Sequence, residues 1–223
     1  MVSRKLYVVF LIIICVIIAN SNTSCNKDKN LIKISGYVFD PNNNTYVQGA
    51  NITVSSIKVS SGFYNSNYTD ISSATTEANG SFSFEFDQEK SAGYRFYIFK
   101  ENYFDHTIDV PDAAIQPENI YAPAFELYTV SYLKIHVKNS SPYDENDFIA
   151  YSYNIDNINC VDCCTNTVLK GYGTSYDSAY KCKTYGSRNV QINWHVTKWG
   201  YDIAYSDTVF CTAFDTAFYE ILY

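Results

Sequence analysis

Alternation of apolar and polar residues with a period of two is the feature that most limits what this chain can fold into. In the segment TTEANGSFSFEF, Phe82, Phe84 and Phe86 alternate with small or charged residues and follow Asn79-Gly80. Such alternation is typical of a strand with one buried face, and Asn-Gly favours the positive φ angles of a tight hairpin. The segment therefore predicts a hairpin whose aromatic strand faces a core.

The same alternation recurs along most of the chain and predicts further strands. Inward-facing positions are predicted at Ile32, Ile34, Gly36 and Val38, at Ala50, Ile52 and Val54, at Leu133, Ile135 and Val137, and at Val190, Ile192, Trp194 and Val196. Other strands are expected over 93–100, 102–110, 147–155, 208–214 and 216–223. A composition of 22 Tyr and 14 Phe against a single Met also favours strands over helices. We therefore expect an all-β protein.

The first 25 residues have the order of a secretory signal. Arg4 and Lys5 precede an apolar run of 14 residues from Leu6 to Ala19, and a short polar segment then leads to Cys25. The run is shorter than the roughly 20 residues that a membrane-spanning helix needs. A signal peptide is therefore favoured over a permanent transmembrane anchor.

The position of Cys25 resembles the processing site of bacterial lipoproteins, because small Thr23 and Ser24 stand before it. The resemblance implies that Cys25 is the lipidated first residue of the mature chain, so that the membrane is a partner through the lipid. Asn22 stands where that family usually has an aliphatic residue, and cleavage without lipidation remains the alternative.

Pro117 to Pro123 is bounded by prolines and lacks alternation, which favours a domain boundary there. The 199 residues that follow the signal suffice for one large sandwich or for two domains of about 100 residues. We expect a signal peptide over 1–24, a tether over 25–30, one β-sandwich over 31–122 and a second, cysteine-containing β-sandwich over 123–223.

Segments of the first half resemble the carboxypeptidase regulatory-like domain, a transthyretin-type Greek-key β-sandwich common in Bacteroidetes surface proteins. The resemblance covers about Ile32 to Val110 and rests on ISGYVFD, VQGANITV, TTEANGSFSFEF and YRFYIFKENYFD, with Gly36, Asp40, Gly49-Ala50 and Asn79-Gly80 as its marks. It implies a non-catalytic module. Together with Lys27 and Asp28, which resemble an export signal of Bacteroidetes lipoproteins, it implies the outer membrane, at the periplasmic face or the cell surface.

Five cysteines remain in the last third of the chain: Cys160, Cys163, Cys164, Cys182 and Cys211. In an oxidising compartment they are disulfide candidates, and an odd number leaves one thiol over or one intermolecular bond. Neighbouring cysteines on an extended chain point in different directions, so Cys163 and Cys164 should have different partners. A zinc site is disfavoured because Cys182 and Cys211 lack the close spacing of a second ligand pair.

The charge and motif content excludes several classes of function. The mature chain carries 14 basic against 23 acidic residues without a basic cluster, so nucleic acid is not an expected partner. The three histidines, His106, His136 and His195, are expected to be structural, and no catalytic or phosphate-binding motif occurs. We therefore expect no catalytic residues, no metal and no cofactor.

The segment GYGTSYDSAYKCKTYG, from Gly171 to Gly186, is the part most typical of a binding surface. Tyrosines among Gly, Ser and Thr give a large contact area at low cost in side-chain entropy. The ligand-binding candidates are Tyr172, Tyr176, Tyr180 and Tyr185. The alternative is a disulfide-held loop whose tyrosines cover the sandwich edge.

Taken together, these patterns predict a membrane-anchored envelope lipoprotein that acts as a non-catalytic binding or adhesion module for a glycan or protein partner. A structural accessory subunit of an envelope complex is the first alternative. A glycan- or peptide-directed hydrolase is the second, because catalytic groups can assemble from distant residues without a local motif.

Overall fold

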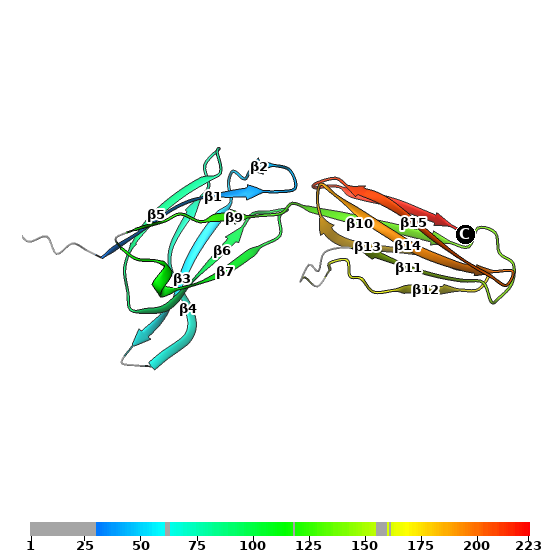
Figure 1. Ribbon diagram of the computed structural model, residues 1–223, viewed down its shortest axis with the longest axis horizontal. Coiled ribbons are helices and arrows are strands. Elements are labelled where there is room, and N and C mark those ends of the chain that lie inside the picture. The colour runs from blue at the N-terminus through cyan, green and yellow to red at the C-terminus, as the bar shows by residue number, and fades with distance from the viewer. Residues whose placement is uncertain (1–29, 61–62, 118, 155–159, 161) are drawn as a thin grey trace, which may run out of the picture.

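The computed structural model describes residues 30–60, 63–117, 119–154, 160 and 162–223, and Figure 1 shows them as two lobes placed end to end. The expected signal peptide and Cys25 lie outside the described residues. Nearly all regular structure in the described part is β-strand, with one short 3-10 helix, η1 (Asp112–Ala114), which confirms the all-β prediction. None of the described residues belongs to a helix of the length and apolar character needed to cross a membrane.

The first lobe consists of two sheets. The central strand of one sheet is β1 (Leu31–Asp40), which pairs antiparallel with β2 (Thr45–Tyr46) and β5 (Ser81–Asp87) and parallel with β8 (Ile120–Tyr121) and β9 (Ala124–Glu126). The other sheet has the order β4 (Phe63–Thr75), β3 (Asn51–Ser60), β6 (Ser91–Phe99) and β7 (His106–Pro111).

The alternation of the sequence accounts for the core of this lobe. Ile32 and Ile34 of β1 and Ile52 and Val54 of β3 are buried between the sheets. The three aromatic rings of β5 are buried with them and stack along the strand. Because burial of apolar surface is the main favourable term in folding, these inward rows hold the two sheets together.

The turn at Asn79-Gly80 differs from the expected hairpin. Gly80 has a φ of +74°, but Asn79 is not in the positive-φ region, and the flanking strands β4 and β5 belong to different sheets. The turn is closed locally by the Gly80 amide, which donates to the carbonyl of Glu77. It therefore carries the chain from one layer of the sandwich to the other.

The first core extends further along the chain than expected. Phe125 and Leu127 are buried in it, and β8 and β9 extend the sheet of β1. The expected boundary between 122 and 123 therefore falls inside the first hydrophobic core. The sequence of the proline-bounded segment predicts a linker because β8 and β9 have only two and three residues. Strands this short show no sustained alternation of apolar and polar residues.

The second lobe also consists of two sheets. One has the order β13 (Asp177–Tyr185), β10 (Val130–Lys138) and β16 (Thr216–Leu222), with β16 parallel to β10. The other has the order β12 (Leu169–Tyr172), β11 (Phe148–Asn154), β14 (Arg188–Lys198) and β15 (Tyr201–Cys211). Leu133, Ile135 and Val137 of β10 face Ile192 and Val196 of β14 across the core, as their alternation predicts.

Polar side chains and aromatic rings join the two lobes. The Asn42 amide donates to the Gly186 carbonyl, and the rings of Phe104 and Tyr128 lie 4.9 Å and 4.8 Å from the ring of Tyr185. The Val130 amide donates to the carbonyl of Asn102. The chain therefore enters β10 directly from a bonded junction between the lobes.

Two disulfides are present, Cys160–Cys163 and Cys164–Cys182, and Cys211 is a buried free cysteine. Neighbouring Cys163 and Cys164 thus have different partners, as their extended backbone predicts. The Cys164–Cys182 bond attaches the segment before β12 to strand β13. An isolated bridge between Cys163 and Lys183 adds backbone pairing at the same place, so this segment covers the edge of β13.

Candidate binding site on the second sandwich

The outer face of the four-stranded sheet of the second lobe carries rows of small and polar side chains. Antiparallel pairing places Ala150 opposite His195, and His195 opposite Ala204. The next row on this face consists of Ser152, Asn193 and Ser206, in the same strand order. Directly opposed residues share a face, so each row projects away from the core.

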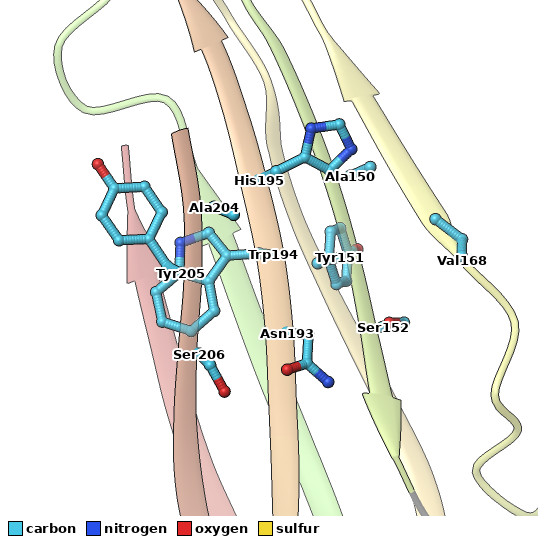
Figure 2. A pocket seen from close by; sticks show the side chains of 10 residues that line it. All are labelled: Ala150, Tyr151, Ser152, Val168, Asn193, Trp194, His195, Ala204, Tyr205 and Ser206. Carbon is cyan, nitrogen blue, oxygen red and sulfur yellow. The ribbon is translucent and has the colours of Figure 1, made fainter. Parts of the chain in front are cut away.

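Small residues on both sides of β14 leave a hollow of about 510 Å³ on this face. Its lining consists of Ala150, Tyr151, Ser152, Val168, Asn193, Trp194, His195, Ala204, Tyr205 and Ser206. Figure 2 shows the imidazole of His195 beside Ala150, and Asn193 between Ser152 and Ser206. By strand alternation, the side chains of Tyr151, Trp194 and Tyr205 point to the opposite, inner face, so they contribute mainly backbone.

The polar groups of the hollow retain bonding capacity. Among the described residues, the Asn193 amide and the Ser152 hydroxyl have no hydrogen-bond partner, and Ser206 Oγ accepts from Gln191 Nε2 at 3.0 Å. An amide offers two donors and an acceptor, and a hydroxyl offers both roles. The hollow can therefore satisfy a ligand group that both donates and accepts.

His195 is oriented by a carboxylate. Its Nδ1 lies 2.9 Å from Oδ1 of Asp202, which also accepts from Thr197 Oγ1 at 3.2 Å. The bond to His195 holds the pKa of the Asp202 carboxyl below its usual value, so Asp202 is ionised at neutral pH. This arrangement leaves the second ring nitrogen of His195, Nε2, available to a ligand.

Two aromatic rings lie beyond the row of His195, next to the residues that line the hollow. Phe148 lies opposite Tyr172 in the pairing of β11 with β12, with 4.9 Å between the ring centroids, and its ring is 5.5 Å from that of His195. Tyr172 is 64% exposed. Exposed aromatic rings next to polar groups are common at sites that bind amphipathic ligands.

The four predicted tyrosines do not form one surface. Tyr172 lies beside the hollow, whereas Tyr176 packs on the second core, with its ring against Gly171. Tyr180 lies on β13, in the other sheet, and stacks on Tyr153 at 6.2 Å. Tyr185 packs at the junction between the lobes, so among these four only Tyr172 stays a candidate for the hollow.

The segment 171–186 is not the loop that its composition indicates. Strand β13 occupies Asp177–Tyr185 and pairs with β10 along its full length. The Gly, Ser and Thr content of the segment obscures the strand pattern in the sequence. The inward residues of the strand include Cys182 and Thr184, both buried. Sequence reasoning also missed Asn193 and Ser152, whose one available signal was their place on the outward face of predicted strands.

The remaining histidines, His136 and His106, lie outside the hollow. His136 lies on the outer face of the other sheet, where its Nε2 is 2.7 Å from Asp177 and its Nδ1 is 2.9 Å from Glu220. These two bonds raise its pKa above the usual value. Burial lowers the pKa of His106. Within the described part of the chain, no group of three or more His, Cys, Asp or Glu residues is arranged to hold a metal ion.

Comparisons with known proteins found no matching family model and no matching curated protein. Solved structures with remote similarity include the Bacillus anthracis TIE protein, at 11% identity and a TM-score of 0.36, with 85% of this chain and 33% of that chain covered. The shaft pilin SpaA of Lactobacillus rhamnosus GG has 10% identity and a TM-score of 0.30, with 86% and 97% covered.

A third such structure is GBS52, the minor pilin of Streptococcus agalactiae, at 10% identity and a TM-score of 0.31, with 85% of this chain and 94% of that chain covered. The present chain spans about a third of the length of the TIE protein. These TM-scores are too low to support an argument about function, which therefore rests on the residues described above.

Proposed function

We propose that this protein is a non-catalytic binding module of the cell envelope, anchored by a lipid at Cys25, and that its hollow binds a neutral sugar. The observation that carries the proposal is the unpartnered Asn193 amide and Ser152 hydroxyl in the hollow, with the exposed ring of Tyr172 two rows further along the strands, beyond the row of His195. Sugar hydroxyls donate and accept hydrogen bonds, and the C–H face of a sugar ring packs on an aromatic ring.

The same residues support binding over hydrolysis. A serine nucleophile needs a base within hydrogen-bond reach, and His195 with Asp202 would be the base and its orienting carboxylate. Ser152 and Ser206 lie in the row next to that of His195, and no hydrogen bond among the described residues joins either serine to the imidazole. These contacts therefore favour binding over hydrolysis.

The sugar proposal is tested with the full chain on a panel of immobilised neutral and acidic oligosaccharides, followed by titration calorimetry with the best neutral one. Asn193→Ala should weaken binding by about tenfold or more, because it removes a hydrogen-bonding group from a partly desolvated site. Asn189→Ala is the matched control, since Asn189 lies on the same strand and face outside the hollow. Equal affinities for the two variants, or no neutral ligand at all, would refute the proposal.

The anchor has a separate test, because Cys25 lies outside the described residues. Cys25→Ala should release the protein from the membrane fraction and abolish a fatty-acyl mass on the mature N-terminus. Cys15→Ala is the control, since Cys15 lies in the expected signal peptide and should leave the anchor intact. A Cys25→Ala variant that still fractionates with membranes would contradict the lipid attachment.

A further inference from the structure

One side of the second sandwich leaves inward-facing side chains uncovered. Ile203 of β15 lies directly opposite Val196 of β14 and shares its face, yet Ile203 is 50% exposed whereas Val196 is 9% exposed. Tyr205 and Tyr201 on the same face are 46% and 69% exposed. The inner face of β15 therefore extends beyond the core that covers its neighbour.

The unequal number of strands in the two sheets explains why Ile203 and Tyr205 are exposed. In the described part of the lobe, the sheet of β15 has four strands, whereas the facing sheet has three and ends at β16. The last strands of the two sheets are in contact where the Tyr219 hydroxyl donates to Asp207 at 2.6 Å. A strand added beside β16 would lie over Ile203 and Tyr205 and would make the two sheets equal.

Both edges on this side are unpaired among the described strands, because β15 and β16 each end their sheet. We name this place the open side, defined by Tyr201, Ile203 and Tyr205 of β15 and the free edge of β16. Proteins usually protect such edges with lysine, proline or a covering segment. Neither β15 nor β16 contains lysine, arginine or proline.

The opposite side of the same sandwich is protected by lysines and by a covering segment. Its edge strands carry Lys170 on β12 and Lys181 and Lys183 on β13. The segment held by the Cys164–Cys182 disulfide covers β13, where the Lys183 amide donates to the carbonyl of Asp162. The lack of protection at the open side is thus specific to that side and not general to the fold.

The charge of the open side indicates what can bind there. Between Tyr201 and Leu222 the chain has four carboxylates, Asp202, Asp207, Asp215 and Glu220, and no basic residue. Two copies of this edge would bring like charges together, and the whole chain already has a net charge of −7. An extended segment with basic side chains complements the edge better than a second copy does.

We propose that the open side is a docking site for an extended segment of a partner protein, in which apolar residues alternate with lysine or arginine. The segment pairs with the free edge of β16, and its apolar side chains cover Ile203 and Tyr205. Its basic side chains project from the outer face of the same sheet, where Glu220 lies. Main-chain hydrogen bonds supply affinity in this mode of recognition, and the alternating side chains supply specificity. The site is distinct from the hollow, which lies on the outer face of the other sheet.

The probe is a synthetic peptide of about eight residues in which lysine and valine alternate, a length that fits one strand. Binding to the full chain is measured by fluorescence anisotropy at low and high salt. We expect saturable binding that weakens with salt, and weaker binding by about tenfold or more for the matching peptide of glutamate and valine. A peptide with its lysines and valines in two separate blocks should also bind more weakly, because it lacks the alternation.

Ile203→Lys should weaken binding of the lysine-valine peptide by about tenfold or more, because it places an inward-pointing charge on the open side. Thr208→Lys is the control, since it adds the same charge to the outer face of the same strand and should change affinity little. Unfolding midpoints of both variants show whether each is folded. No binding, equal binding of the three peptides, or equal affinities for the two variants would overturn the proposal.

Sedimentation of the full chain tests whether a second copy of this chain occupies the open side instead. We expect a monomer at the concentrations used for peptide binding. A dimer that Ile203→Lys dissociates and Thr208→Lys preserves would overturn the proposal, because it would assign the open side to a second copy of this chain.

Discussion

The hydroxyl of Ser187, in the turn after β13, donates a hydrogen bond to the side-chain oxygen of Asn43, in the turn after β1. The two residues are 144 positions apart and belong to different sandwiches. The Asn43 amide nitrogen also donates to Asp40 at 2.7 Å and to Thr129 at 3.2 Å. One side chain thus connects the first sandwich, the connecting segment and the second sandwich.

Asn43→Ala should therefore loosen the junction. Three side-chain contacts are lost, each with a net contribution of roughly 1 kcal/mol. We expect faster hydrogen exchange at the amides of Val130 and Gly186, which are bonded across the junction, and little change inside either core. Asn119→Ala is the control, since Asn119 is exposed and remote from the junction. Unchanged exchange in Asn43→Ala would show that the other junction contacts, such as the rings around Tyr185 and the Asn42–Gly186 bond, suffice without Asn43.

Gly80 should tolerate substitution less well than Gly49. Both have positive φ angles, of 74° and 72°, so an alanine at either position costs about 1 kcal/mol in backbone strain. A Cβ at Gly80 would also lie 2.7 Å from the carbonyl oxygen of Val38, whereas a Cβ at Gly49 meets nothing within 4 Å. Denaturant titration should give a loss of about 3 kcal/mol or more for Gly80→Ala. Similar losses for the two variants would contradict the steric part of this argument.

Lys198 should be important for the stability of the second sandwich. Its buried ammonium donates to Asn139 at 2.6 Å and to the Ser141 carbonyl at 2.9 Å, and it lies 3.7 Å from buried Asp147. Burial lowers the pKa of Lys198. Lys198→Met would leave Asp147 without its counter-charge, at a cost of about 3 kcal/mol or more. The exposed Lys170→Met should cost less than about 0.5 kcal/mol, as measured by urea unfolding.

The pH dependence of stability should include a contribution from the His136 cluster, which consists of His136, Asp177 and Glu220. Hydrogen bonds that His136 donates to the carboxylates of Asp177 and Glu220 raise the pKa of His136. The stability that His136 contributes is therefore full below its unfolded pKa near 6.5 and is lost as pH rises through its folded pKa. The bond to His136 lowers the pKa of Asp177, whose contribution is lost as pH falls through its folded value. Stability from this cluster should be greatest between about pH 4 and 6.5. His136→Gln should flatten the alkaline side of the profile, and an unchanged profile would exclude the cluster as its cause.

The cysteines of the second sandwich should differ in reactivity. Alkylation of the native protein should label none of Cys160, Cys163, Cys164, Cys182 and Cys211, because burial raises the pKa of the Cys211 thiol to about 11. Unfolding without reductant should label Cys211 alone. Replacing Cys164 and Cys182 by alanine should cost about 3 kcal/mol, given their separation of 18 residues. Peptide mapping by mass spectrometry would detect any other connectivity.

Positions with regular alternation could be predicted from the sequence, whereas those governed by turns and pairing could not. Ile32, Val54 and Ile135 are buried as expected, because one face of a two-sided sheet must exclude water. Strand β15 begins at Tyr201 and not at residue 208, since Trp199-Gly200 forms the preceding turn with both residues at positive φ. The tryptophan at position 199 does not indicate a turn in the sequence, because bulky residues rarely adopt a positive φ angle.

The candidate site was less predictable than the fold. The tyrosine content of the sequence indicated a site at 171–186. The hollow instead forms where small side chains from three paired strands meet. Which strands pair depends on contacts between segments that are distant in the sequence. Ser152, Asn193 and Ser206 come from different strands and share a row because of register alone. Their individual residue types carry no signal of that proximity.

Strand β10 has a mechanical consequence for a protein held at one end. It follows directly from the junction and is paired with β13 from Val130 to Lys138 and with β16 from Tyr132 to Lys138. Tension between an anchored N-terminus and a ligand on the second sandwich would enter through this strand and act along its length, so two rows of backbone hydrogen bonds would have to shear together. Because forced unfolding is governed by the unfolding rate, we expect the second sandwich to withstand steady pulling longer than its equilibrium stability alone would suggest.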